Sequence, residues 1–240
     1  MSVLVVTGTS TDVGKTVATA AVAAMIGASG RTVGVCKPVQ TGIAPGEDGD
    51  LAEVARLSGV ETLVELARYP DPLAPDTAAR RSGRPMISCS DVVAAVEELA
   101  ETHDVVLVEG AGGLLVRMGT DGFTVVDVAA GLEAPVAVVA AAGLGTLNHS
   151  ELTVRALGAA GLSCSGLIVG SWPDEPGLAD RCNLDDLPQV TGVPVIGRIP
   201  AGSGSLGRAG FVAAAPGWFE SNWVDSLAEQ AGDERSRVGQ

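Results

Sequence analysis

The stretch SVLVVTGTSTDVGKT, residues 2–16, decides how this chain folds. Its first half is a short run of mostly β-branched residues that ends at Gly8, as a buried strand does. Its second half carries Gly14, Lys15 and Thr16, and an alanine-rich segment without proline continues to Ala28. Because alanine has the highest helix propensity, we expect a helix over residues 13–28. The sequence therefore predicts a strand, a glycine-containing loop and a helix.

The loop GTSTDVGKT, residues 8–16, is typical of a phosphate-binding loop. Backbone N–H groups around Gly14 can point at phosphate oxygens, and the N-terminus of the following helix adds positive potential. Lys15 would reach the outer phosphates, and the Thr16 hydroxyl would bind magnesium. The spacing is a variant, because the usual pattern places its first glycine at position 9 and here it stands at Gly8. The alternative is a glycine-rich turn that binds no nucleotide.

Further apolar runs predict more buried strands at residues 33–38, 103–109, 135–143, 165–171 and 194–200. Helical patterns separate them at residues 50–57, 90–101 and 146–159, with Ser90 and Thr146 as possible N-caps. Parallel strands need a crossover connection, which is usually a helix. The pattern therefore predicts an α/β fold: a single-domain, doubly wound, mostly parallel sheet of the phosphate-loop NTPase type with helices on both faces. Its ligands should bind at the carboxyl ends of the strands.

Composition limits the classes of function. The formal charge of −14 repels nucleic acid and anionic membranes, and no apolar run reaches the roughly 20 residues of a membrane span. We expect a cytoplasmic protein with one domain over residues 1–230, ending in a docking helix over residues 216–230, and a disordered polar tail over residues 231–240. The cysteines show no C-x-x-C pairing and are expected to be reduced: Cys36, Cys89, Cys164 and Cys182.

Acids and a second lysine stand where the predicted strands end. Glu109 ends an apolar strand, and Asp50 follows a glycine-rich loop, with Asp48 as its nearest rival and a helix N-cap as its alternative role. Lys37 precedes Pro38, which is expected to end the second strand, so that Lys37 and Thr41 would face the same ligand edge. A lysine there can neutralise charge on a transferred phosphoryl group, although a solvated lysine is the simpler interpretation.

Two glycine-rich segments offer further anion-binding backbone. VEGAGGLLV, residues 108–116, supplies N–H groups directly after Glu109, and GLGTLNHS, residues 143–150, leaves a strand and opens a helix. A tight turn and a capped helix start are the alternatives for the two. Neither His103 nor His149 has the partners of a catalytic triad, so both are assigned to local hydrogen bonding.

Taken together and in this order, GTSTDVGKT, VCKPVQTG, VEGAGGLLV and GLGTLNHS resemble the dethiobiotin synthetase family over about residues 1–202. The resemblance implies a ligase of biotin biosynthesis that converts 7,8-diaminononanoate, CO2 and ATP or another NTP into dethiobiotin, NDP and phosphate. It also implies a Mg²⁺ cofactor and a homodimer with sites at the subunit interface. No residue is suited to covalent catalysis, so positioning and charge stabilisation would have to dominate.

The same resemblance implies a role for each site residue. Lys15 and Lys37 would be catalytic and flank the phosphates, while Thr16, Asp50 and Glu109 would hold magnesium. The diamine end would meet Thr41 and the Gly112 backbone, and the distant carboxylate would rest on the partner subunit's helix start, from Leu144 to Asn148. The nucleotide would contact the acids Asp50 and Glu109 and three segments: Thr11, Asp12, Val13, Gly14, Lys15, Thr16 and Val17; Gly110, Ala111 and Gly112; and Gly170, Ser171, Pro200, Ala201 and Gly202.

One departure from the family concerns the nucleobase. Many members carry an asparagine that reads adenine after the strand at residues 165–171, whereas this chain has Ser171 and Trp172.

Two other classes of protein are weaker alternatives for the function. A partitioning ATPase would carry an extra lysine in its phosphate loop, at the position where this chain has Ser10. A small-molecule kinase would carry an arginine-rich lid, for which Arg80, Arg81 and Arg84 are the candidates.

Overall fold

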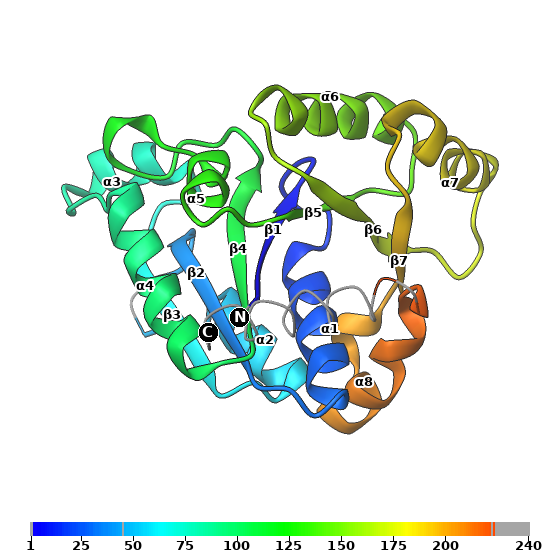
Figure 1. Ribbon diagram of the computed structural model, residues 1–240, viewed down its shortest axis with the longest axis horizontal. Helices are drawn as coiled ribbons and strands as arrows, with labels where there is room; N and C mark the ends of the chain where they lie inside the picture. Colours follow the sequence, from blue (N-terminus) through cyan, green and yellow to red (C-terminus); the bar gives the residue numbers. More distant parts are fainter. Residues whose placement is uncertain (1, 45, 222, 224–240) are drawn as a thin grey trace, which may run out of the picture.

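The computed structural model describes residues 2–44, 46–221 and 223. The seven strands within these residues form one parallel sheet in the order β3-β2-β4-β1-β5-β6-β7, as the alternation of strands and helices predicts (Figure 1). The strands are β1 (Ser2–Gly8), β2 (Val33–Thr41), β3 (Thr62–Tyr69), β4 (Val105–Gly113), β5 (Val136–Ala140), β6 (Cys164–Trp172) and β7 (Val195–Pro200). The order reverses at β1, which lies between β4 and β5, so the loop after β1 stands at the switch point where doubly wound sheets bind ligands.

Helices cover both faces of the sheet. One face carries α1 (Lys15–Ala28), α2 (Asp50–Ser58), α8 (Arg208–Ala214) and the 3₁₀ turn η3 (Ala215–Trp218). The other carries α3 (Pro75–Ser82), α4 (Cys89–Thr102), α5 (Val125–Gly131), α6 (Thr146–Ala159) and α7 (Leu178–Thr191). Two short 3₁₀ turns, η1 (Thr120–Gly122) and η2 (Ser203–Ser205), lie in connections. None of the described helices is long and apolar enough to cross a membrane.

Helix α1 lies at the centre of its face and explains why the chain uses so much alanine. Every residue from Ala18 to Ile26 is buried, because the sheet packs on one side of α1, and α2, α8 and η3 pack on the other. A helix surrounded by protein is apolar all round, and its small side chains allow close approach. The helix that follows the phosphate loop is thus held rigidly against the sheet.

Strand β2 differs from the prediction at Pro38. The strand does not end there but continues to Thr41, because it stays paired with β3 up to Thr41↔Tyr69. Its pairing with β4, by contrast, ends at Cys36↔Val108. Lys37 therefore follows the last residue of β2 that is paired with β4, four residues before the end of the strand. The side chains of Lys37 and Glu109 meet where the two strands part.

Several other boundaries also differ from the predictions. Ser88, rather than Ser90, caps α4, in a capping box with Asp91. Thr146 is not a cap, because α6 follows Gly145 and has no side-chain cap. Strand β4 runs on past Glu109 to Gly113. Of the predicted helix over residues 216–230, residues 222 and 224–230 lie outside the described residues. Pro216–Trp218 belong to η3, and Ser221 and Trp223 are helical. The predicted disordered tail lies wholly outside them, and all four cysteines are free thiols.

Candidate functional site

The phosphate loop packs tightly against the end of β6. Gly14 adopts a left-handed conformation with φ 92°, and a Cβ there would lie 2.6 Å from the Gly170 carbonyl oxygen. A Cβ on Gly170 would lie 2.0 Å from the Val13 carbonyl oxygen. Both positions therefore require glycine, one for its conformation and both for space. This contact brings the predicted nucleotide residue Gly170 beside the loop.

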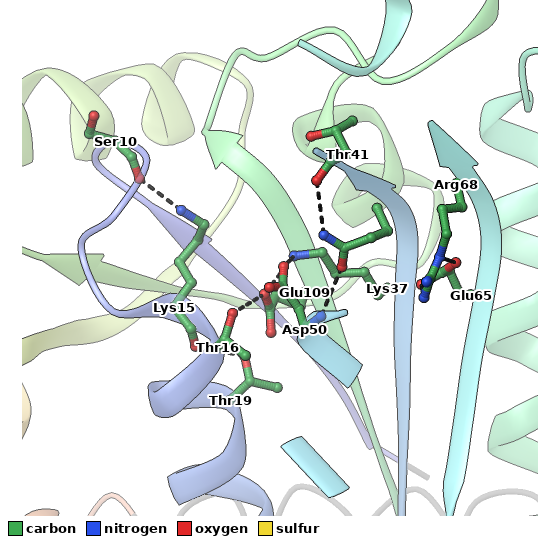
Figure 2. A network of polar contacts seen from close by, with 11 residues as sticks. Ser10, Lys15, Thr16, Thr19, Lys37, Thr41, Asp50, Glu65, Arg68 and Glu109 are labelled. Carbon is green, nitrogen blue, oxygen red and sulfur yellow. Dashed lines mark hydrogen bonds and ion pairs between the residues drawn. The ribbon is translucent and has the colours of Figure 1, made fainter. Parts of the chain in front are cut away.

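Lys15 is a buried cation at the first turn of α1. Its Nζ donates a hydrogen bond of 2.8 Å to the Ser10 carbonyl, so the side chain folds back over the phosphate loop (Figure 2). Burial lowers the pKa of Lys15, and the positive charge of Lys37 lowers it further. The negative charges of Glu109, Asp50 and Asp12 oppose that shift. Lys15 makes no ion pair with a carboxylate among the described residues, and a desolvated cation of this kind is ready to receive an anion.

Lys37 joins the two predicted acids into one network (Figure 2). Its Nζ donates to Glu109 Oε1 at 2.7 Å and also to Asp50 Oδ2, and Thr16 Oγ1 donates to Glu109 Oε1 at 3.0 Å. Residues from α1, β2, α2 and β4 thus meet at one point beside the phosphate loop. Asp50, and not its rival Asp48, makes the contact with Lys37.

Burial makes this network electrostatically strong. Lys37 is 3% exposed and Glu109 is fully buried. Burial alone would lower the pKa of Lys37, but the charges of Glu109 and Asp50, and their hydrogen bonds, outweigh it and raise the pKa. The Lys37 ammonium is therefore retained at neutral pH. Lys15 and Lys37 are the only lysines of the chain, and all the other basic residues apart from the two histidines are arginines.

A cleft of about 470 Å³ opens over this network. Many of the predicted site residues line it: Thr11, Asp12, Gly14, Lys15, Thr16, Val17, Lys37, Thr41, Asp50, Glu109, Ala111 and Gly112. The loop after β1, the start of α1, the end of β2, the start of α2 and the end of β4 supply them. The cleft therefore combines phosphate-binding backbone, two lysines, three acids and the residues predicted to meet the diamine.

The remaining predicted residues do not line this cleft. Leu144 and Asn148 stand at the start of α6, where Leu144 is 93% exposed. Pro200, Ala201 and Gly202 end β7 and begin its following loop, and the Ala201 N–H donates to the Trp172 carbonyl at 2.7 Å. Val13 is buried, and neither Gly110 nor Ser171 is among the lining residues.

Sequence reasoning missed two polar residues of this region. Gln40 lines the cleft from β2 and is only 4% exposed. Arg56 of α2 donates to the carbonyls of Gly204 and Leu206, and so fastens the loop after β7 to α2. Gln40 belongs to the motif VCKPVQTG, but nothing in that motif points to its contact with α2, and nothing in the sequence pairs Arg56 with a loop about 150 residues away.

The arginines of the possible kinase lid are engaged elsewhere. They form ion pairs or hydrogen bonds around α3: Arg80 with Asp76, Arg81 with Asp71, and Arg84 with the Arg68 carbonyl. None of the three lines the cleft. His103 makes local hydrogen bonds to Leu99 and Thr62, as expected.

The oxygen donors of the network suit magnesium. Glu109 Oε2 is buried and lacks a hydrogen-bond partner among the described residues, so a carboxylate lone pair is available for a cation. Asp50 and the Thr16 hydroxyl lie in the same cleft. Mg²⁺ prefers hard oxygen ligands, commonly one or two carboxylates with substrate phosphates. No group of three or more acidic, histidine or cysteine side chains that could hold a metal occurs in the described part of the chain, so any site here would need other ligands as well.

Comparison with known proteins identifies close relatives. A family model described as an AAA domain matches residues 2–205. The chain is 70% identical to the ATP-dependent dethiobiotin synthetase BioD of Rhodococcus jostii, over 94% of this chain and 98% of that protein. It is 60% identical to the protein of the same name from Streptomyces coelicolor, over 97% of this chain and all of the relative.

Solved structures at lower identity share the fold. A ParA family ATPase from Chlorobium tepidum aligns with a TM-score of 0.57 at 16% identity, covering 96% of this chain and 98% of its own. The septum site-determining protein MinD from Pyrococcus horikoshii, solved with Mg-ADP, aligns with a TM-score of 0.55 at 13% identity, covering 99% and 97%. At these identities the likeness concerns the fold alone.

Proposed function

Since the chain belongs to the ATP-dependent dethiobiotin synthetase family, we propose that it closes the ureido ring of dethiobiotin from 7,8-diaminononanoate, CO2 and a nucleoside triphosphate. The observation that carries the proposal is the Lys37 ammonium between Asp50 and Glu109, beside Thr16 and the phosphate loop. The same cleft includes Thr41 and Gly112, which would meet the two amines.

The proposed reaction needs positioning and charge stabilisation more than a nucleophilic side chain. One amine attacks CO2 and loses a proton to give a carbamate. A carbamate oxygen then attacks the γ-phosphorus and displaces NDP, which leaves a carbamic-phosphoric anhydride. The second amine attacks the carbonyl carbon, and phosphate departs with the carbamate oxygen. Lys15 and Lys37 would stabilise the charge that develops on the transferred phosphoryl group.

Magnesium would be held by the Thr16 hydroxyl and the carboxylates of Asp50 and Glu109. When bound, it would neutralise phosphate charge and orient the γ-phosphoryl group for in-line transfer. The buried, unpartnered Oε2 of Glu109 supports this assignment. Lys37, which forms ion pairs with both of these acids, would then stand between the metal ligands and the carbamate.

The proposed active unit is a homodimer in the cytoplasm. Leu144 and Asn148 are exposed and lie outside the cleft of their own chain, so a carboxylate contact from them would come from the partner subunit. Gly145 leaves the first N–H groups of α6 without a side-chain cap, as an anion-binding helix start requires. One end of the diamine would then bind to each subunit.

Labelled CO2 tests the proposed activity. We expect the carbon of labelled CO2 to enter a product of the mass of dethiobiotin, with one NDP formed for each product molecule, and only when both diamine and NTP are present. NDP formation that does not depend on diamine would indicate a simple NTPase. Phosphorylated diamine without the labelled carbon would indicate a kinase.

The lowered pKa of Lys15 predicts weaker nucleotide binding in alkaline solution. Triphosphate favours the ammonium form, whereas the free enzyme loses this proton below the usual pH range of a lysine. The affinity should therefore fall as pH rises through the lowered pKa, by at most about tenfold per pH unit. Calorimetric titration with a non-hydrolysable nucleotide measures it. A Lys15→Arg variant, whose guanidinium stays charged, should bind without that alkaline decline; the same decline in both proteins would exclude Lys15 as its cause.

Nucleobase selectivity should be weak. Ser171 is exposed and too short to form a paired contact with adenine, while the Trp172 ring packs on the core beneath Arg198, 5.9 Å from the guanidinium. A paired amide contact gives about 1–3 kcal/mol of base discrimination, so its loss should reduce ATP preference by about 10- to 100-fold. We expect CTP, GTP and UTP to support turnover. A kcat/KM for ATP more than about 100-fold above all three would contradict this prediction and would assign base recognition to backbone groups.

A further inference from the structure

Helix α2 begins without a cap of its own. Its N-cap residue is Gly49, which has no side chain to accept the first backbone N–H groups. Gln40, on β2, takes that place: its Oε1 accepts a hydrogen bond of 2.9 Å from the Asp50 N–H. The other end of the amide donates to the Thr41 carbonyl at 3.1 Å and so fixes the orientation of the Gln40 side chain.

Gln40 accepts this hydrogen bond from Asp50, the residue whose carboxylate contacts Lys37. Asp50 is the first residue of α2, so the backbone held by Gln40 is the base from which the Asp50 carboxylate extends. Arg68 restrains the loop that leads to Asp50, because it donates a hydrogen bond of 2.5 Å to the Glu47 carbonyl and is also paired with Glu65. The start of α2 is thus fastened to β2 and β3.

Gly49 is needed to leave room for this arrangement. Its φ of −107° is open to any residue, so conformation does not explain the glycine. A Cβ there, however, would lie 2.9 Å from Gln40 Oε1 and 3.1 Å from Arg68 Nη2. An alanine would therefore displace the Gln40 amide from the Asp50 N–H. Gln40 and Gly49 together form one structural device.

We propose that Gln40 is a positioning residue, which replaces the missing N-cap of α2 and holds the Asp50 carboxylate in place for the phosphate and metal site. The inference rests on the proposed function, in which Asp50 belongs to that site. Partners that orient metal-ligating carboxylates typically change metal affinity or activity by 10- to 100-fold when they are removed. Gln40 is buried and lies next to Asp50, the proposed metal-ligating residue, as such a partner must.

The test removes the acceptor while keeping the volume. In Gln40→Met, we expect the Mg²⁺ dependence of nucleotide binding, measured by calorimetry with a non-hydrolysable nucleotide, to shift to at least about tenfold higher Mg²⁺. The amide proton of Asp50 should also exchange faster. Gly49→Ala should reproduce both changes. Matched controls are Gln189→Met, on the exposed side of α7, and Gly210→Ala in α8, where a Cβ meets open space; both should leave Mg²⁺ dependence unchanged.

A double-mutant cycle separates positioning from direct substrate contact. If Gln40 acts through Asp50, then Gln40→Met should change binding and kcat by less than about twofold when Asp50 is already alanine. A full Gln40 effect in that background, or an unchanged Mg²⁺ dependence in Gln40→Met, would overturn the inference. If Asp50→Ala alone alters neither quantity while labelled CO2 still enters the product, the placement of Asp50 is wrong and the inference fails with it, although the proposed reaction stands.

Discussion

Replacing Lys37 with alanine is expected to lower kcat by about 10²–10³, the usual cost of removing one preorganised electrostatic donor. The ammonium is almost fully buried, carries two carboxylate hydrogen bonds and faces the cleft, so water cannot replace its charge at low cost. Lys15, the only other lysine, is already bonded to the phosphate loop at the Ser10 carbonyl, so no spare amine can take over. Measured at saturating substrates, a Lys37→Ala enzyme with more than half of normal kcat would exclude this role.

Stability must be measured alongside this rate. Without Lys37, Asp50 and Glu109 remain as an uncompensated acidic pair, and breaking a buried ion pair typically costs about 3–5 kcal/mol of unfolding free energy. We therefore expect a lower Tm for Lys37→Ala and a larger rise of Tm on addition of Mg²⁺ than in the original protein. Arg81→Ala, which removes an exposed cation paired with Asp71, is the matched control and should change neither kcat nor Tm appreciably.

Mixing two defective variants should restore activity if the substrate site is shared between subunits. Lys37→Ala removes the phosphate side of a site, and Asn148→Asp places a negative charge where the diamine carboxylate would bind. In a heterodimer of the two, one site combines the intact Lys37 of one subunit with the intact Asn148 of the other. Random exchange makes about half of the dimers heterodimers, so about one quarter of normal activity should return.

The two variants alone set the baseline for this experiment. Each homodimer should show less than about one tenth of normal kcat/KM at limiting diamine, so a return to about one quarter is readily measured. Heterodimers carrying two different affinity tags can be purified to prove that they form. Purified heterodimers without recovered activity would place both halves of the site within one subunit. Asn148 is exposed at the helix start, so its replacement should not disturb the fold.

The sequence predicts the central part of the fold well because that part follows local rules. The strands that enclose the phosphate loop are continuous apolar runs, as strands buried on both faces must be. Strand β3 escaped prediction because it lies at the sheet edge and carries Glu65 and Arg68 among its apolar residues. The short helices α3 and α5 have only two turns each, too few for a clear helical period.

The candidate site was predictable in its residue types but not in its contacts. Lys15, Thr16 and Glu109 follow from motif and strand position, and the cleft includes all three. The predicted position of Lys37 at the end of its strand was wrong. Proline has no N–H, so Pro38 ends the pairing of β2 only on the side of β4, where that N–H would be needed. On the other side, β2 stays paired with β3. The Gln40 contact to Asp50 joins two elements through a loop whose path depends on tertiary packing.

We expect a carbamate oxygen, and not water or a hydroxyl group, to attack the γ-phosphorus in this cleft. Heavy-oxygen-labelled CO2, added to the enzyme with diamine and NTP and quenched before exchange with water, tests it directly. The proposed reaction predicts one labelled oxygen in the phosphate released with each dethiobiotin, because the departing phosphate keeps the carbamate oxygen. Phosphate that carries oxygen only from water and NTP would contradict it.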